Sequence, residues 1–253
     1  MWKSSRLVLL LAVPGLVAAA CGDDDEGGAG GDITVFAATS LTEALSDAGE
    51  AFAAAHEGSS IEFSFDASSA LVTQITEGAP ADVFASADVP TMDKLTDAGL
   101  NGSDPVVFAT NLLTIIVPAG NPGGVTGVED LAKPDLTVVL CAEEVPCGNY
   151  ANQILEAVGV QVTPASFEEN VRGVVTKVTS GEADAGIVYV TDVTAAGDAA
   201  QSVEIPENIN VLAEYPIATV AESANQDTGQ AFVDFITGAD GQAILAEYGF
   251  GSP

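Results

Sequence analysis

The chain has 253 residues, of which 47% are hydrophobic, and it carries 37 acidic against six basic residues, for a formal net charge of −31 at pH 7. This length suits one large domain or two small ones with an ample core. Because nucleic acids and anionic membrane surfaces are bound through Lys and Arg, so acidic a chain is not expected to bind either of them. The acidic excess is best interpreted as a solvated surface.

The first residues have the pattern of an export signal. Lys3 and Arg6 precede the apolar stretch 7–17, which is too short for a comfortable membrane span. Small residues then lead to Cys21, which resembles the cleavage site of a bacterial lipoprotein, although Ala18 stands where Leu is usual. The alternative is an ordinary secretory signal with a chance cysteine.

The lipoprotein interpretation predicts in which cellular compartment the protein is located. We predict a signal peptide over residues 1–20, lipidation of Cys21, and a flexible, glycine-rich tether over residues 21–31. The protein would then be extracytoplasmic, anchored by lipid to the outer face of the cytoplasmic membrane.

Beyond the tether, segments typical of strands alternate with segments typical of helices. Strands are expected at 33–37, 61–65, 82–86, 106–110, 112–117, 136–141, 185–189 and 211–220, the last interrupted by Pro216. Helices are expected at 41–56, 71–77, 91–98, 149–158, 168–180, 228–237 and 239–248. This alternation predicts an α/β fold with doubly wound, mostly parallel sheets flanked by helices.

The junctions between strands and helices are the places where such folds bind ligands. Four junctions offer small residues, hydroxyls or free backbone N–H groups, namely AATSLT (37–42), FDASSA (65–70), VPCGNY (145–150) and NVRG (170–173). A helix N-terminus presents unpaired N–H donors and a partial positive charge, so it can bind an anion without a cationic side chain. These four junctions are therefore a candidate anion site.

Each junction also has a purely structural interpretation. Ser40 and Glu43 have the spacing of a capping box, and Ser68 with Ser69 would cap the following helix. Pro146 is common at the first position of a helix. Taken one by one, these structural explanations are the more frequent ones.

The few cysteines and histidines restrict the chemistry. With Cys21 assigned to lipid, Cys141 and Cys147 remain, and in an oxidising compartment such a pair is more often a short-loop disulfide than two free thiols. A metal site on these two cysteines lacks further ligands, because His56 is the single histidine. The same scarcity removes most nucleophile–histidine arrangements, so we do not expect an enzyme.

Seven stretches together resemble the molybdate-binding proteins of molybdate ABC importers. They are ITVFAATSLTEAL (33–45), FDASSALVTQITEGAPADVFASAD (65–88), EEVPCGNYA (143–151), ENVRGVV (169–175), GIVYVTD (186–192), EYPIATV (214–220) and AEYGF (246–250). The most specific parts are GAPADVFASAD and GIVYVTD. The resemblance implies a two-lobed periplasmic-binding-protein fold of type II, with the ligand in the cleft between the lobes.

The same resemblance implies how the chain divides. Residues 32–110 together with 216–253 would form lobe 1, and residues 111–215 would form lobe 2. The chain would cross between the lobes near Thr110-Asn111 and again near Glu214-Tyr215, where a hinge motion would close the cleft.

The resemblance also implies which residues contact the oxyanion, through its oxygens and not its metal atom. They are Ser40, Ser68, Cys147, Val171 and Tyr189. The serines would give hydroxyl and backbone N–H groups, Tyr189 its phenol, and the other two their backbone N–H alone. Cys147 stands where the family often has Ala, a change that a backbone donor tolerates. For Arg172 the resemblance implies no direct contact, and a structural ion pair is expected instead.

A cage of neutral donors would suit a tetrahedral dianion that carries no proton. Hydrogen phosphate must donate a hydrogen bond, and a cage without an acceptor leaves that proton unpaired at a cost of about 1–3 kcal/mol. Sulfate accepts hydrogen bonds only, so cavity size alone would exclude it.

The function implied is capture of molybdate, and of tungstate, by a monomer that needs no cofactor and serves an ABC permease with its ATPase. It would contact the membrane only through its lipid anchor, and no nucleic acid. Three alternatives remain: a receptor of the same fold for another anion such as sulfate, phosphate or a carboxylate, an enzyme on this scaffold, and a ligand-sensing module. The implied cleft residues include no paired carboxylates, and nothing appended to the fold supports a sensor.

Overall fold

The computed structural model describes residues 30–253. The predicted signal peptide, the lipidation site Cys21 and all but the last two residues of the predicted tether lie outside the described residues. Among the helices of residues 30–253, none is both long enough and apolar enough to cross a membrane.

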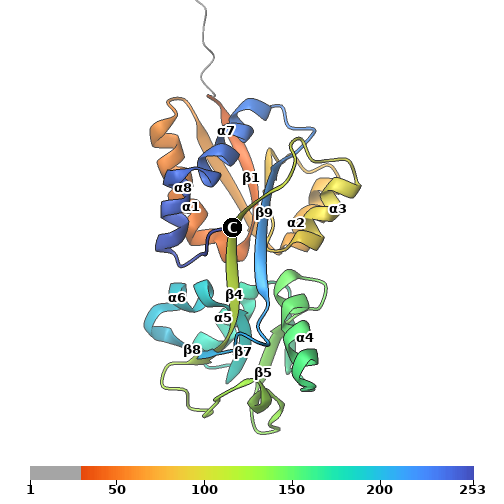
Figure 1. Cartoon of the computed structure of the whole chain (residues 1–253), viewed down its shortest axis with the longest axis vertical. Helices are drawn as coiled ribbons and strands as arrows, with labels where there is room; N and C mark the ends of the chain where they lie inside the picture. The colour runs from red at the N-terminus through yellow and green to blue at the C-terminus, as the bar shows by residue number, and fades with distance from the viewer. Residues whose placement is uncertain (1–29) are drawn as a thin grey trace, which may run out of the picture.

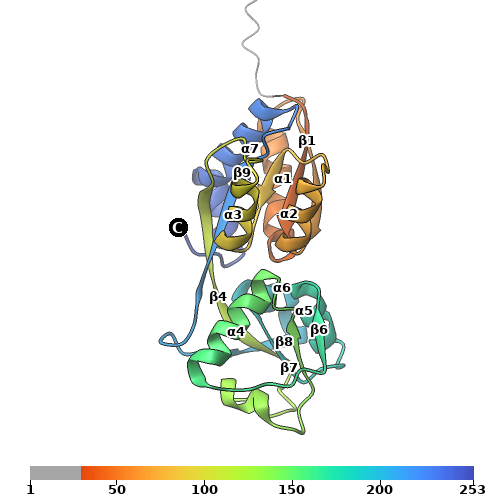
Figure 2. The ribbon, with the colours of Figure 1, turned by 90° about the vertical axis from the view of Figure 1, so that its right-hand side faces the viewer.

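The chain folds into an upper and a lower lobe (Figures 1 and 2). The parallel strands of the upper lobe are β1 (Asp32–Ala38), β2 (Ser60–Asp66) and β3 (Val83–Ala85). Its helices are η1 (Thr39–Leu41), α1 (Thr42–Ala55), α2 (Ser68–Thr76), α3 (Val89–Asp97), α7 (Gln226–Thr237) and α8 (Ala239–Glu247). The C-terminal helices therefore return to the lobe that the N-terminal strands begin (Figure 1).

The lower lobe is built from the middle of the chain (Figure 1). Its parallel strands are β5 (Val138–Cys141), β6 (Ser166–Glu168) and β7 (Ala185–Tyr189). Its remaining elements are η2 (Val128–Ala132), α4 (Pro146–Val158), α5 (Val171–Thr179), α6 (Val190–Ala196), η3 (Gly197–Ala199) and β8 (Ala200–Glu204).

Two long strands, β4 (Val106–Pro118) and β9 (Leu212–Thr219), join the lobes. They pair antiparallel with Thr110 opposite Glu214, and they complete one curled sheet of order β2-β1-β3-β9-β4-β7-β5-β6, with β8 also on β4. The two-lobed α/β fold is thus confirmed, with antiparallel pairing added where β4 and β9 cross. The exact lobe boundaries stay a prediction, because both strands run through the crossing without a break.

Helix α1 shows how local pattern produces this packing. Its buried residues Leu45, Ala48, Gly49 and Phe52 recur every three or four positions on one face. A Cβ atom at Gly49 would lie 2.6 Å from the ring of Phe63 in β2, so only glycine permits so close an approach. This contact fixes α1 against the sheet, with its first turn at the carboxyl end of β1.

Two predicted interruptions are wrong. The strands expected at 106–110 and 112–117 form the single strand β4, and Pro216 does not interrupt β9. Pro216 lies opposite Val107, and the register shifts between Val107 and Ala109. Such an irregularity accommodates a residue that has no N–H to donate to the ladder.

The helix predicted at 168–180 begins later, at Val171. Residues 166–168 form strand β6, and Asn170 caps α5 by accepting a hydrogen bond from the N–H of Gly173 at 3.2 Å. The short elements α6 and β8, of seven and five residues, were not predicted. The sequence AQSVE of β8 does not alternate apolar with polar residues, which is the pattern that indicates a half-buried strand.

Cys141 and Cys147 form a disulfide with a Cα–Cα distance of 5.8 Å. It joins the end of β5 to the first turn of α4. The backbone is crowded here, because a Cβ atom at Gly148 would lie 1.9 Å from the carbonyl oxygen of Ala142. The disulfide and Gly148 together hold the N-terminus of α4 close to the strand end.

Replacing both cysteines by serine should lower the free energy of unfolding by about 2–3 kcal/mol, because a short loop is no longer closed in the unfolded chain. Urea unfolding of the oxidised wild type and the Cys141→Ser/Cys147→Ser variant measures the difference. A reductant should destabilise the wild type and leave the variant unchanged. Equal stability of wild type and variant would contradict this account.

Candidate anion-binding site

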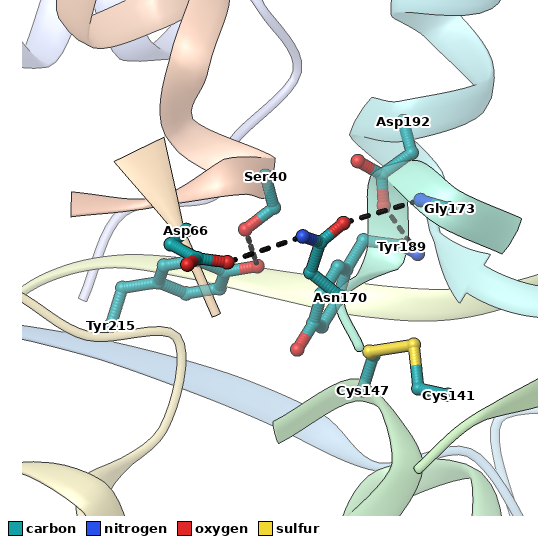
Figure 3. Close-up of a disulfide and its surroundings, with 9 residues drawn as sticks. All are labelled: Ser40, Asp66, Cys141, Cys147, Asn170, Gly173, Tyr189, Asp192 and Tyr215. Carbon is teal, nitrogen blue, oxygen red and sulfur yellow. Dashed lines mark hydrogen bonds between the residues drawn. A yellow bond between two sulfur atoms is a disulfide. The ribbon is translucent and has the colours of Figure 1, made fainter. Parts of the chain in front are cut away.

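A small cavity lies between the lobes, at the carboxyl ends of the strands. It is lined by Ala38, Thr39, Ser40, Asp66, Ala67, Ser68, Ala87, Val145, Pro146, Cys147, Asn170, Val171 and Tyr189. All five residues implied by the sequence resemblance are among them, and they come from elements on both lobes. Figure 3 shows three of them, Ser40, Cys147 and Tyr189. The structure therefore brings together the four junctions, which are far apart in the sequence.

Ser40 does not cap helix α1, so the predicted capping box is wrong. A 3-10 turn over Thr39–Leu41 delays the helix, whose N-cap is Leu41 with no side-chain hydrogen bond. The Ser40 hydroxyl instead lies 3.2 Å from the phenol oxygen of Tyr215 on β9. This hydroxyl is therefore free of the usual local role of a serine at such a junction.

Ser68 does not cap its helix either. It is the first residue of α2, whose N-cap is Ala67, a residue without a side-chain oxygen. The Ser68 hydroxyl oxygen accepts a hydrogen bond from the N–H of Ala87 at 3.0 Å. Since that bond uses a lone pair, the hydroxyl proton of Ser68 remains available to a group in the cavity.

The two junctions of the lower lobe offer backbone N–H groups. Cys147 lies in the first turn of α4, whose N-cap is Val145 and has no side-chain hydrogen bond. Val171 opens α5, and the Asn170 cap reaches only the N–H of Gly173. N–H groups in a first turn have no partner within the helix, so both positions present donors.

Tyr189 provides the most informative single atom. Its side chain is 1% exposed, and its hydroxyl is the only buried side-chain polar atom without a hydrogen-bond partner among residues 30–253. Burial raises the pKa of this phenol well above its usual value, so the phenol is protonated and donates. An unpaired buried hydroxyl costs about 1–3 kcal/mol, which an acceptor bound in the cavity would offset.

Two polar contacts join the lobes beside the cavity. The guanidinium of Arg172 in α5 pairs with Glu43 in α1 at 2.7 Å, and Asn170 donates to the Asp66 carboxylate at 3.2 Å (Figure 3 shows the second contact). Arg172 thus forms an ion pair, as the sequence led us to expect. These contacts join the starts of helices from the two lobes beside the cavity.

Asp192 contacts the backbone of Tyr189, one of the residues that line the cavity. Its carboxylate accepts a hydrogen bond from the N–H of Tyr189 at 3.0 Å (Figure 3). Burial raises the pKa of Asp192 to about 7, outweighing the lowering effects of this N–H and of Arg172. Asp192 and Asp66 were not among the expected site residues, although Asp192 has a local signal, because it stands three residues after Tyr189 at a helix start.

The donors all point to an anion. Within the described part of the chain no group of three or more His, Cys, Asp or Glu residues could hold a metal ion. The cavity instead gathers serine hydroxyls, a phenol and the N–H groups of first helical turns, which suit an acceptor with several oxygens. The Asp66 carboxylate also lines the cavity, and its Oδ1 accepts from the N–H of Ala67 at 2.7 Å and from Asn170 at 3.2 Å.

The raised pKa of Asp192 predicts a pH effect on stability. Between about pH 4 and pH 7 the folded protein holds a proton that the unfolded chain releases, so the free energy of unfolding falls as pH rises. The Asp192→Asn variant keeps an oxygen for the N–H of Tyr189 but cannot ionise. Its free energy of unfolding at pH 8 should therefore exceed that of the wild type by about 1–2 kcal/mol. This difference is smaller than the whole shift of the pKa would give, because the side chain of Asp192 is partly exposed and solvent screens its charge.

Urea unfolding at several pH values measures this difference. General repulsion in so acidic a chain also lowers stability as pH rises, and it acts equally on both proteins. Parallel pH profiles for the two proteins would show that Asp192 ionises normally in the fold.

The chain matches known proteins over nearly its whole length. Residues 33–251 match the family described as bacterial extracellular solute-binding protein. The chain is 40% identical to the molybdate-binding protein ModA of Mycobacterium tuberculosis (strain ATCC 25618 / H37Rv), over 99% of this chain and 98% of that protein.

Two solved structures share the fold. One is the periplasmic molybdate-binding protein of Azotobacter vinelandii, with a TM-score of 0.76 and 22% identity over 87% of this chain and 99% of that one. The other is the sulfate-binding protein SubI of Mycobacterium tuberculosis H37Rv, with a TM-score of 0.76 and 24% identity over 87% and 86% of the two chains. At these identities the likeness concerns the fold alone. The match over residues 33–251 and the relative at 40% identity establish that this chain belongs to the family of bacterial extracellular solute-binding proteins.

Proposed function

We propose that this protein captures molybdate, and also tungstate, outside the cytoplasm and delivers it to an ABC importer. The observation that carries the proposal is the buried hydroxyl of Tyr189, which has no hydrogen-bond partner. It lines the same cavity as Ser40 and Ser68, two serines that do not cap a helix. The relative that is 40% identical over the whole chain bears the name of a molybdate-binding protein.

The proposed contacts combine three kinds of donor. The hydroxyl and backbone N–H groups of Ser40 and Ser68 bind from the upper lobe. The phenol of Tyr189 and the backbone N–H groups of Cys147 and Val171 bind from the lower lobe. A dianion held by both lobes would favour the closed form, because each lobe alone offers only part of the donor set.

The donor set also bears on the choice of anion. All five proposed contacts donate, so an oxyanion without protons can satisfy them, whereas hydrogen phosphate brings a proton that needs an acceptor. Sulfate remains the alternative ligand, since it also accepts only and a sulfate-binding protein shares this fold. The relative with the highest identity reported above favours molybdate over sulfate.

The proposal also includes the membrane anchor of the protein and the transporter that receives the ion. Cys21 would carry the lipid that tethers a monomer to the membrane, and an ABC permease with its ATPase would receive the ion. The bound oxyanion is cargo, so the protein would act by binding and release, without a cofactor and without catalysis.

Calorimetry on residues 22–253, without lipid and stripped of anions, tests the ligand. Molybdate should bind one to one, and sulfate should bind far more weakly. The Ser68→Ala variant should bind molybdate about 10- to 100-fold more weakly, because it loses one hydrogen bond to a charged ligand.

The matched control is Ser69→Ala, since Ser69 is the adjacent serine in α2 and does not line the cavity. Its affinity for molybdate should equal that of the wild type. A clear response to sulfate with none to molybdate would replace the proposed ligand and leave the fold unchanged.

The ion pair between Arg172 and Glu43 should affect affinity only modestly. Both side chains are more than one-third exposed, and exposed pairs contribute at most about 1 kcal/mol. Arg172→Ala and Glu43→Ala should therefore each weaken molybdate binding by no more than about fivefold, mainly through faster release.

The double variant Arg172→Ala/Glu43→Ala shows whether Arg172 acts through its ion pair between the lobes or by direct contact with the anion. Because the two residues act through one another, Arg172→Ala should add little to Glu43→Ala. A 100-fold loss confined to Arg172→Ala would mean that the guanidinium itself contacts the anion, contrary to the proposal.

A further inference from the structure

A short chain of hydrogen bonds joins the two lobes at the cavity. The Oδ1 atom of Asp66, at the end of β2, accepts from the N–H of Ala67 at 2.7 Å and from Nδ2 of Asn170 at 3.2 Å. The Oδ1 atom of Asn170 in turn accepts from the N–H of Gly173, in the first turn of α5, at 3.2 Å. Figure 3 shows the two bonds that Asn170 makes. The chain therefore connects the start of α2 in the upper lobe with the start of α5 in the lower lobe.

The direction of each bond in this chain is fixed by the chemistry of its groups. A backbone N–H only donates and an ionised carboxylate only accepts. The amide of Asn170 lies between one of each, with its oxygen toward the N–H of Gly173 and its nitrogen toward Asp66. The reverse orientation would place two acceptors together and two donors together. The side chain of Asn170 thus caps α5 and contacts the upper lobe at the same time.

The position of Asp66 calls for an explanation. Its carboxylate lines the cavity, where a negative charge opposes the binding of an anion. Helix α2 does not use this carboxylate as its cap, because its N-cap is Ala67. The contact with Asn170 supplies a role, since Asp66 is the acceptor through which this part of the upper lobe holds the lower lobe.

Both residues stand beside proposed contacts of the anion. Asp66 precedes Ser68 by two residues, and Asn170 directly precedes Val171. Both side chains are partly buried, and both residues line the cavity. A movement that separates the lobes here breaks the hydrogen bond between Asp66 and Asn170 as it moves the donors of Ser68 and Val171 apart.

We infer that Asp66 and Asn170 are positioning residues that form a latch between the lobes and slow the release of the bound anion. The inference rests on the proposed function and deepens it. The latch acts on the separation of the two sets of donors and not by contact with the ligand. It should therefore change the dissociation rates of different oxyanions by the same factor, and their association rates much less.

The Asn170→Ser variant tests the inference. Serine caps a helix about as well as asparagine, so α5 keeps its cap, but the shorter side chain has no amide to reach Asp66. Molybdate should dissociate about 5- to 30-fold faster, because a partly buried hydrogen bond to a charged group is lost. Release of labelled molybdate into an excess of unlabelled molybdate measures the rate. Calorimetry should show the same factor in the affinities for molybdate and tungstate.

Asn225→Ser is the matched control. Asn225 is the N-cap of α7, and its Nδ2 donates to the Asp82 carboxylate at 3.3 Å, so the variant loses the same kind of contact. This contact lies within the upper lobe, and neither residue lines the cavity. The variant should release molybdate at the wild-type rate, even where its free energy of unfolding is lower.

Exchanging the two side chains separates a latch from a merely structural role. Asn170→Asp keeps the cap but sets a second carboxylate against Asp66, so release should be faster than from Asn170→Ser. Adding Asp66→Asn provides an amide that accepts from the N–H of Ala67 and donates to the carboxylate at position 170. This double variant has the net charge of the wild type, and its release rate should return to within about threefold of the wild-type rate.

Two results would overturn the latch while the proposed function stands. One is release from Asn170→Ser at the wild-type rate. The other is a double variant Asp66→Asn/Asn170→Asp that is as stable as the wild type yet releases molybdate as fast as Asn170→Asp. If the double variant does not fold, Asn170→Ser is measured in an Asp66→Ala background, where it should no longer change the rate. An undiminished effect in that background would also overturn the latch.

The choice of anion separates the two proposals. A wild type that binds sulfate and not molybdate would overturn the proposed ligand, and the release rates measured with sulfate would then test the latch. A rate change in Asn170→Ser that is confined to one anion would mean that Asn170 contacts the ligand, contrary to the inference. A wild type that binds none of the three oxyanions would overturn both proposals.

Discussion

The antiparallel pairing of β4 and β9 is the interaction on which the rest of the structure depends. These strands are the only β-ladder that the two lobes share among the described residues, and each continues into the sheet of a lobe. Because the ladder fixes where the lobes can face one another, it brings the ends of β1 and β7 to opposite sides of one cavity. The alignment of the site is thus a property of this pair of strands, the same pair at which the sequence led us to expect a hinge.

The cavity concentrates donors that the fold leaves without partners. Three of the helices that begin there, α1, α2 and α4, have Leu41, Ala67 and Val145 as N-caps, none of which caps through a side chain. Uncapped helices and an unpaired phenol reduce the stability of the protein alone. A bound oxyanion would restore that stability, so binding and closure of the lobes are linked through the same groups.

The strongly acidic composition does not conflict with an anion site. Exposed charges are screened beyond about 10 Å at ordinary ionic strength, whereas the donors in the cavity act at contact distance. Arg172 in α5 is paired with Glu43 at 2.7 Å, and among the residues named as lining the cavity there is no Lys or Arg. Affinity therefore depends on local dipoles, and the net charge chiefly affects the rate of association.

The sequence by itself determined the α/β class and the four junctions, because helix starts and strand ends are local patterns. The five residues expected to contact an anion came from the resemblance of the sequence to a known family and not from the local patterns. The sequence also indicated the pairing of Cys141 with Cys147, which are six residues apart. Only the tertiary structure decided what the side chains at those junctions do. Ser40 has the local spacing of a helix cap, yet its partner is Tyr215, 175 residues away, and Asn111 bonds to Thr191 across 80 residues. No local pattern encodes such pairs, because they exist only once β4 and β9 have brought the two lobes together.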